Sequence, residues 1–185
     1  FRGRLDGQNR TAFGGGVGGA AILPLTKKLD LLAEGLAGPG IGRYAAAVGP
    51  DVAFGPAGEV RPIRGAQGIL GLDWKPTRRW RIYNYVGAEY YARTTFPAAT
   101  AGFGSPLLDL GPCVSENGGP CPGGNRSIWQ AMPGVWYDVH RGEQGAVSLG
   151  ASYIHTRRAL WSGTDGLRPR GAGNSFMASM RYYLP

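Results

Sequence analysis

The sequence predicts an all-β fold built from antiparallel strands, because three patterns recur along the chain. The first is a two-residue alternation over 174–184: one side carries Phe176, Ala178, Met180, Tyr182 and Leu184, and the other carries Ser175, Met177, Ser179, Arg181 and Tyr183. A period of two indicates a strand and not a helix. The second pattern is the placing of aromatic residues at strand ends, and the third is an alternation of short and long connections. Together these patterns are typical of an antiparallel transmembrane β-barrel.

Length and composition favour a single transmembrane β-barrel domain over residues 1–185. The chain has no apolar run of the roughly 18 residues that a transmembrane helix needs, which excludes a helical membrane protein. Residues 1–10 lack the apolar core of a signal peptide. We therefore expect that a signal peptide has been removed or that the chain begins within a longer barrel.

The net charge of +8 raises the question of a nucleic-acid partner. The basic residues are scattered singly or in pairs, such as Arg78–Arg79 and Arg157–Arg158, and form no dense stripe. We therefore expect that the protein does not bind nucleic acid. We expect the positive charge to lie at a rim or in a lumen, where it faces outer-membrane lipids and anionic lipopolysaccharide.

Two hairpins are predicted in the first half of the chain. The first joins strands 11–23 and 29–37 through a turn at 24–28, although 29–37 has leucines on both sides. The second joins 66–74 to 79–93 through a tight turn at 75–78, where Pro76 favours a turn.

Strand 79–93 gives a length scale for the fold. Its apolar side begins at Trp80 and ends at Tyr90, with Asn84 as an exception. At ~3.3 Å per residue and a strand tilt near ~40°, the segment from Trp80 to Tyr90 spans about 25 Å along the membrane normal. That is the height of an outer-membrane apolar band, so the two aromatics are predicted to mark its interfaces.

Three strands follow at 127–138, 146–158 and 174–184, the first two joined by a turn at 139–145. Pro133 cannot donate to a strand ladder, so it predicts a bulge or a local edge. Outer-membrane barrels have short periplasmic turns and long extracellular loops. The long loops are therefore predicted to be extracellular: 38–63, 94–125 and 160–172.

The seven predicted strands have a topological consequence. If the last strand ends in the periplasm, an odd count places residue 1 outside the cell. Closed single-chain bacterial barrels have an even number of strands and leave no edge unpaired. At least one further strand is therefore expected upstream, within 38–63, or from another chain. The sequence is interpreted as at least seven strands of a larger or N-terminally truncated barrel.

The candidate lumen-lining residues lie on the side opposite the predicted lipid surface: Arg79, Arg81, Tyr83, Tyr85, Glu89, Arg93, Gln130, Asp138, Ser148, Ser152 and Arg181. Further candidate lumen charges are Asp30, Glu34, Asp73 and Arg158. Such residues form either a selectivity surface with an anion bias or an ion-pair network that fills a narrow barrel. Both alternatives stay open, because lumen width depends on strand number. The predicted aromatic girdle consists of Trp80, Tyr90, Trp129, Tyr137, Tyr153 and Tyr182.

Cys113 and Cys121 lie in a Gly/Pro-rich stretch without further Cys or His nearby, which predicts an extracellular disulfide and no metal site. The glycines of 14–19 fit G-x-G-x-x-G, but the strand–turn–helix context of a nucleotide site is missing, and no cofactor is expected. His140 and His155 have no evident catalytic partners, so we expect no enzymatic activity.

Four features carry a family resemblance: the girdle aromatics, the alternating loop lengths, the stretch 82–91 and the terminal Met-Arg-Tyr-Tyr-Leu-Pro of 180–185. Through them the chain resembles the C-terminal portion of Gram-negative outer-membrane β-barrel proteins of an uncharacterised, porin-like kind. The resemblance implies that the barrel-assembly machinery recognises the last strand. It is also compatible with other envelope protein chains as partners. The implied function is a porin-like channel or passive pore. The alternative is a structural or interaction barrel with a filled lumen, such as a surface scaffold, an adhesin or a subunit of a larger envelope complex.

Overall fold

The computed structural model describes residues 1–5, 7–97, 100–115, 118–164 and 166–185. Its main feature is one antiparallel sheet of seven strands in the order β13-β12-β11-β8-β7-β4-β3. These strands are β3 (Val17–Thr26), β4 (Leu29–Pro39), β7 (Arg64–Trp74), β8 (Trp80–Tyr91), β11 (Asn125–Gly142), β12 (Gly145–Leu160) and β13 (Arg170–Tyr183). Long strands that follow one another in the chain are antiparallel neighbours in the sheet, so the predicted all-β antiparallel architecture is confirmed.

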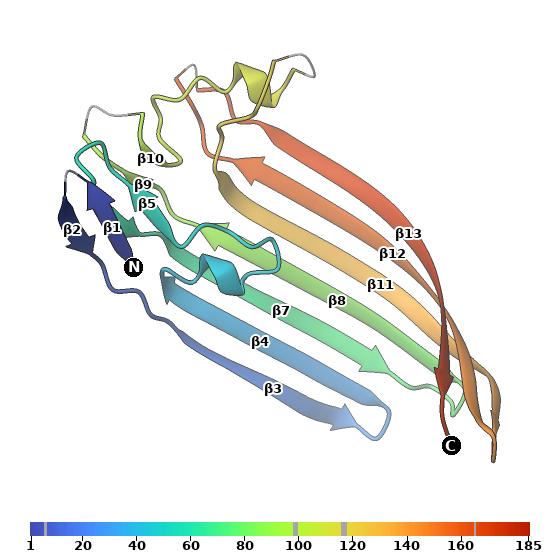
Figure 1. The fold of residues 1–185 in the computed structure, drawn as a ribbon. Helices are drawn as coiled ribbons and strands as arrows, with labels where there is room; N and C mark the ends of the chain where they lie inside the picture. Colours follow the sequence, from blue (N-terminus) through green and yellow to red (C-terminus); the bar gives the residue numbers. More distant parts are fainter. Residues whose placement is uncertain (6, 98–99, 116–117, 165) are drawn as a thin grey trace.

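The sheet is curved, and its two ends differ (Figure 1). The short-turn end carries the connections at 27–28, 75–79 and 143–144, and the long-loop end carries those at 40–63, 92–124 and 161–169. The outermost strands, β3 and β13, each pair on one side only within the described chain. Both run from the long-loop end to the short-turn end.

The long-loop end is elaborated by small elements that the sequence did not predict. They are the hairpins β1 (Arg2–Leu5)–β2 (Gln8–Thr11), β5 (Val52–Phe54)–β6 (Val60–Pro62) and β9 (Thr94–Thr95)–β10 (Gly102–Phe103), and the 3₁₀ turns η1 (Gly42–Tyr44) and η2 (Gly111–Cys113). Since β5 and β6 pair with each other and not with the main sheet, the interpretation that 38–63 hides a further barrel strand is wrong.

Pro24 lies in a strand, and the predicted turn at 24–28 is wrong. It pairs with Asp30, and the turn consists of Lys27 and Lys28 alone. Because β3 is an edge strand, the missing N–H of a proline costs no ladder hydrogen bond there. The first long strand therefore ends later than predicted, at Thr26, and it also starts later, at Val17.

Pro133 causes a local edge, one of the two predicted alternatives, and no bulge, because the pairing with β12 is interrupted at Met132 and Pro133. It faces Asn84 of β8, and on the other side the pairing with β12 has the same register before it, at Ala131–His155, and after it, at Gly134–Ser152. The register shifts of β11 lie instead at its two ends, between Asn125 and Ser127 and between Asp138 and His140.

The apolar core of the described chain lies among the long loops and not on the main sheet. Tyr91, at the end of β8, packs there with residues of the neighbouring connections: Ala45, Ala53, Ile63, Phe96 and Phe103. Ile63 is the most enclosed of these side chains, at 1% exposure. Among the described residues, no helix has the length and apolar composition needed to cross a membrane.

Candidate functional site

The main sheet presents two chemically different faces. Along β8, exposed residues alternate with half-buried ones: Trp80, Ile82, Val86 and Tyr90 are exposed, whereas Arg81, Tyr83, Tyr85 and Glu89 are half-buried. A sheet with one face in water normally buries the apolar side and exposes the polar one; here the arrangement is reversed. Paired residues of adjacent strands point to the same side, so the strand register extends these two faces across the sheet.

The apolar face is the one that carries Trp80. The pairing places on it, among others, Leu31, Leu70, Leu72, Val86, Trp129, Val135, Tyr137, Val147, Leu149, Tyr153, Phe176, Met180 and Tyr182. Two of its aromatic pairs are close, with 4.7 Å between the ring centroids of Trp80 and Tyr137 and 4.9 Å between those of Tyr153 and Phe176. The predicted girdle residues thus share one face, and their contact with lipid stays a prediction.

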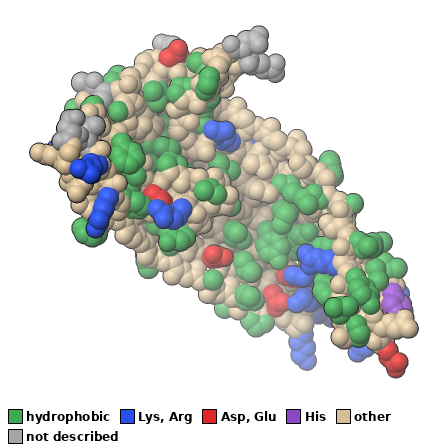
Figure 2. Space-filling view, viewed as in Figure 1, with side chains coloured by type: hydrophobic (Ala, Val, Ile, Leu, Met, Phe, Trp, Pro, Cys, Tyr) green, Lys and Arg blue, Asp and Glu red, His purple; other side chains and the backbone are tan. Residues whose placement is uncertain are grey.

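The polar face carries an ion-pair layer toward the short-turn end. The Arg81 guanidinium donates from Nε to both oxygens of Asp73, at 3.0 and 2.7 Å, and Nη2 adds a further bond. Nearby, the guanidinium of Arg181 lies 4.0 Å from the ring centroid of Trp136. Figure 2, viewed from this side of the sheet, shows acidic and basic side chains gathered toward this end.

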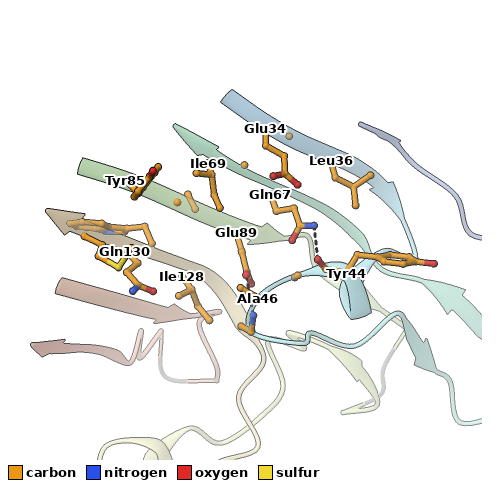
Figure 3. A pocket seen from close by; sticks show the side chains of 18 residues that line it. Glu34, Leu36, Tyr44, Ala46, Gln67, Ile69, Tyr85, Glu89, Ile128 and Gln130 are labelled. Carbon is orange, nitrogen blue, oxygen red and sulfur yellow. Dashed lines mark hydrogen bonds between the residues drawn. The ribbon is translucent and has the colours of Figure 1, made fainter. Parts of the chain in front are cut away.

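A cavity of about 570 Å³ lies on the same face, nearer the long-loop end (Figure 3). Its sheet wall comes from β4, β7, β8 and β11, and its other wall comes from the segment 44–47, which begins at the last residue of η1. Glu34, Gln67, Glu89 and Gln130 contribute polar groups to the lining, but most of its surface is apolar and comes from side chains such as Leu36, Ile69 and Ile128. Such a lining can hydrogen-bond to a polar solute and hold its less polar parts against aromatic and aliphatic side chains.

Hydrogen bonds tie the segment 44–47 to the sheet. Gln67 donates from Nε2 to the carbonyl oxygen of Tyr44 at 2.9 Å, and the Ala47 N–H donates to Glu89 Oε1 at 3.1 Å. The Tyr91 hydroxyl donates to the other oxygen of Glu89, at 3.1 Å. Glu89, predicted as a lumen charge, therefore anchors the loop that covers the cavity.

The structure places most predicted lumen residues on the polar face, namely Arg81, Tyr83, Tyr85, Glu89, Gln130, Asp138, Ser148, Ser152 and Arg181. Two assignments to strand 79–93 are wrong, because β8 is shorter than predicted. Arg79 lies in the turn before it and donates to the Tyr137 hydroxyl at 3.5 Å. Arg93 lies in the following connection, stacked 4.8 Å from the Trp161 ring centroid and bonded to Ser162.

Ser148 is more enclosed than an open lumen position would be. It is 2% exposed, and its hydroxyl donates to Asp138 Oδ1 at 2.7 Å. Arg141 donates to the other Asp138 oxygen at 2.6 Å. Asp138 and Ser148 are therefore joined in a hydrogen-bonded group at the short-turn end.

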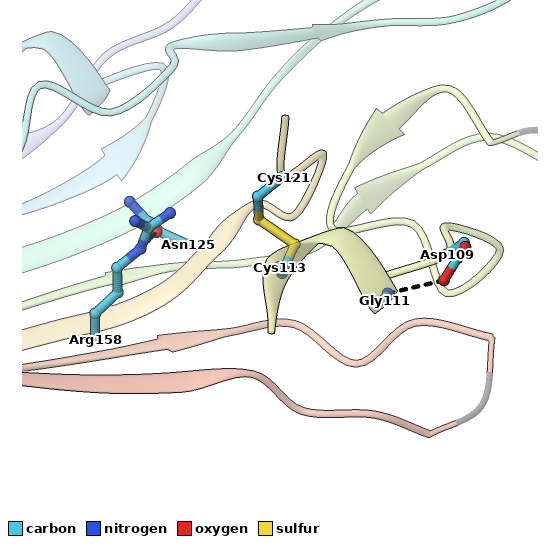
Figure 4. The surroundings of a disulfide bond; sticks show 6 residues. All are labelled: Asp109, Gly111, Cys113, Cys121, Asn125 and Arg158. Carbon is cyan, nitrogen blue, oxygen red and sulfur yellow. Dashed lines mark hydrogen bonds between the residues drawn. A yellow bond between two sulfur atoms is a disulfide. The ribbon is translucent and has the colours of Figure 1, made fainter. Parts of the chain in front are cut away.

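The predicted disulfide is confirmed. Cys113 and Cys121 are bonded, with their Cα atoms 4.5 Å apart, in the loop between β10 and β11 (Figure 4). The η2 turn ends at Cys113, and at its first residue the Gly111 N–H donates to Asp109 Oδ1 at 2.8 Å. This places the disulfide at the long-loop end, above the sheet.

The two histidines occupy separate places. His155 lies on the apolar face, where its Nδ1 is 2.7 Å from Asn174 Oδ1, and the Tyr153 hydroxyl donates to the same oxygen at 2.7 Å. His140 lies at the short-turn end of β11. In the part of the chain that the structure describes, no group of three or more His, Cys, Asp or Glu is placed to hold a metal ion.

The cavity wall formed by 44–47 was missed by sequence reasoning, which treated 38–63 as a loop outside the membrane. No periodicity marks this segment, because its position depends on contacts with Gln67, Glu89 and Tyr91, which are distant in sequence. Alternation along β7 does place Gln67 on the polar side, and this was the one available signal.

Comparisons with known proteins give no further assignment. The chain matches no protein-family model, no curated protein and no solved structure.

Proposed function

We propose that this chain forms part of an outer-membrane β-barrel whose polar face lines a porin-like passage for small polar solutes. The observation that carries the proposal is the reversed exposure of the sheet, with apolar side chains outward and charged ones half-covered. Among the exposed residues are Leu70 at 61%, Phe176 at 83% and Met180 at 72%. Soluble monomers rarely expose contiguous apolar patches beyond roughly 300–600 Å². Lipid contact removes that cost.

The cavity beneath 44–47 leaves space along the polar face for a passage. Its wall offers Glu34, Gln67 and Gln130, whose polar groups favour water over acyl chains. The loop over it is fixed at Gln67 and Glu89, so it narrows the space without filling it. We infer that solutes pass between this loop and the remaining wall of the barrel.

The second candidate is a barrel with a filled lumen, which acts as a scaffold or as a subunit of an envelope complex. The ion-pair layer of Asp73 and Arg81, with Arg181 stacked on Trp136, favours it. In a narrow barrel the same side chains would meet those of the opposite wall and leave no continuous water path.

Conductance of the folded chain in planar bilayers tests both candidates. The informative variant is Gln130→Cys in the cavity, with Ala131→Cys on the apolar face as its neighbouring control. A water-soluble methanethiosulfonate reagent should block the current of the first variant and leave the second unchanged. Insertion without conductance would support the filled barrel, and failure of the chain to insert at all would reject both.

A further inference from the structure

The apolar face ends in a row of arginines at the long-loop end. Within the seven strands, all of which are described, the charged residues on this face are Arg64, Arg157 and Arg170. Arg157 lies across from Trp129, with its guanidinium 5.8 Å from that ring centroid. Arg170 is paired with Ala159, two residues further along β12. Diagonal neighbours of this kind lie about 7–8 Å apart.

Arg126 extends the row toward β8. It occupies the register shift between Asn125 and Ser127, and its guanidinium lies 5.4 Å from the ring centroid of Trp161. That indole in turn meets Tyr90 edge-on, with 6.0 Å between centroids. We call Arg64, Arg126, Arg157 and Arg170 the arginine rim; it crosses the long-loop end of the apolar face from β7 to β13, at about the level of Trp129 and Tyr90.

The charges of the arginine rim are unmatched within the described chain. All four side chains are exposed, and none forms an ion pair or hydrogen bond with a described residue. By contrast, Arg43, Arg81 and Arg141 are each paired with an aspartate. Stacking on an indole covers one face of a guanidinium and leaves its N–H groups free to donate in the ring plane.

We infer that the arginine rim binds the phosphorylated headgroup of a lipid whose acyl chains lie on the apolar face below it. This rests on the proposed membrane location. Guanidinium groups bind phosphate oxygens bidentately, and each cation near an anionic lipid surface contributes favourably to binding. An amphiphile is required because the cationic row borders exposed Trp129 and the other apolar residues, and a water-soluble anion would use only half of that surface.

The test titrates the folded 185-residue chain, in zwitterionic detergent, with a diphosphorylated lipid A and follows binding by native mass spectrometry. The variant is Arg157→Gln with Arg170→Gln. Its matched control is Lys27→Gln with Arg78→Gln, which removes the same charge from exposed residues at the short-turn end. Phosphatidylcholine and inorganic phosphate serve as the neutral lipid and the headgroup alone.

We expect lipid A to bind the wild-type chain and the control with equal affinity. We expect its affinity for the rim variant to be lower by about tenfold or more. Phosphatidylcholine should show no difference among the three proteins, and inorganic phosphate should not compete at millimolar concentration. Equal losses in the rim variant and the control would overturn the inference, as would strong competition by inorganic phosphate or by a soluble polyanion. Because β content and heat-dependent electrophoretic mobility are measured on the same samples, failure to fold in detergent would count against the proposed membrane location instead.

Discussion

Ala131 and Gln130 are adjacent on β11 and point to opposite faces, so they test the membrane assignment at nearly one depth. Ala131 lies on the apolar face, opposite Val86, between the rows of Trp80 and Tyr90. Val86 is about 20 Å along the strand from Trp80 and about 13 Å from Tyr90 at ~3.3 Å per residue, which puts it near the middle of the apolar band. Arginine at the midplane of a barrel costs about 2–4 kcal/mol.

Ala131→Arg should therefore lower the folding equilibrium constant by roughly 30- to 1,000-fold, since about 1.4 kcal/mol corresponds to tenfold. Gln130→Arg should fold within about 1 kcal/mol of wild type, because its side chain reaches into the polar cavity and replaces one long polar group by another. Urea titration of folding into phosphatidylcholine vesicles, followed by tryptophan fluorescence, measures both. Equal costs for the two variants, or the larger cost at Gln130, would refute the assignment of the faces.

Three further predictions concern the polar face and the loops. Asp73→Asn should destabilise the fold by about 1–2 kcal/mol, since Asp73 is buried but the side chain of its partner Arg81 is 43% exposed. Urea titration should show that Arg81→Gln lowers the free energy of unfolding less in the Asp73→Asn background than in wild type. Full additivity of the two substitutions would contradict the pairing. Replacing both Cys113 and Cys121 by Ser should cost about 3 kcal/mol at most, because the closed loop is short, and should leave the far-ultraviolet circular dichroism of the sheet unchanged. Gly49→Val should displace the loop over the cavity, because a Cβ there lies 2.5 Å from the Tyr91 ring; faster labelling of a Gln67→Cys thiol reports this. Gly15→Ala, which meets nothing within 4 Å, is its control, and equal labelling in both would disprove the packing argument.

The strands and their neighbours could be predicted because each signal is local. Alternation along 79–93 and 174–184 reflects one strand at a time, and short turns join consecutive strands into a meander. Strand ends were less predictable. Pro24 reads as a turn residue unless β3 is known to be an edge, and the hairpin of β11 and β12 continues past Asp138 through a register shift that no alternation shows.

The candidate site could be predicted only in part, because its second wall depends on tertiary contacts. Parity alone placed Arg81, Glu89 and Gln130 on one face. The loop that covers the cavity at Glu89 and Gln130 is held through contacts of 44–49 with Glu89 and Tyr91, and these contacts join residues more than 40 positions apart. Arg93 shows the opposite error: its charge and parity suggested a lumen, whereas the strand had already ended and the side chain stacks on Trp161.

The shared direction of β3 and β13 limits how this sheet can be joined to copies of itself. In a ring of identical chains standing upright in one membrane, β13 of each copy would meet β3 of the next. Both strands run toward the short-turn end, so every such junction would be parallel, whatever the number of copies. An antiparallel ring therefore requires an odd number of additional strands at each junction. Each copy, counted with its junction, then accounts for an even number of strands in the closed ring.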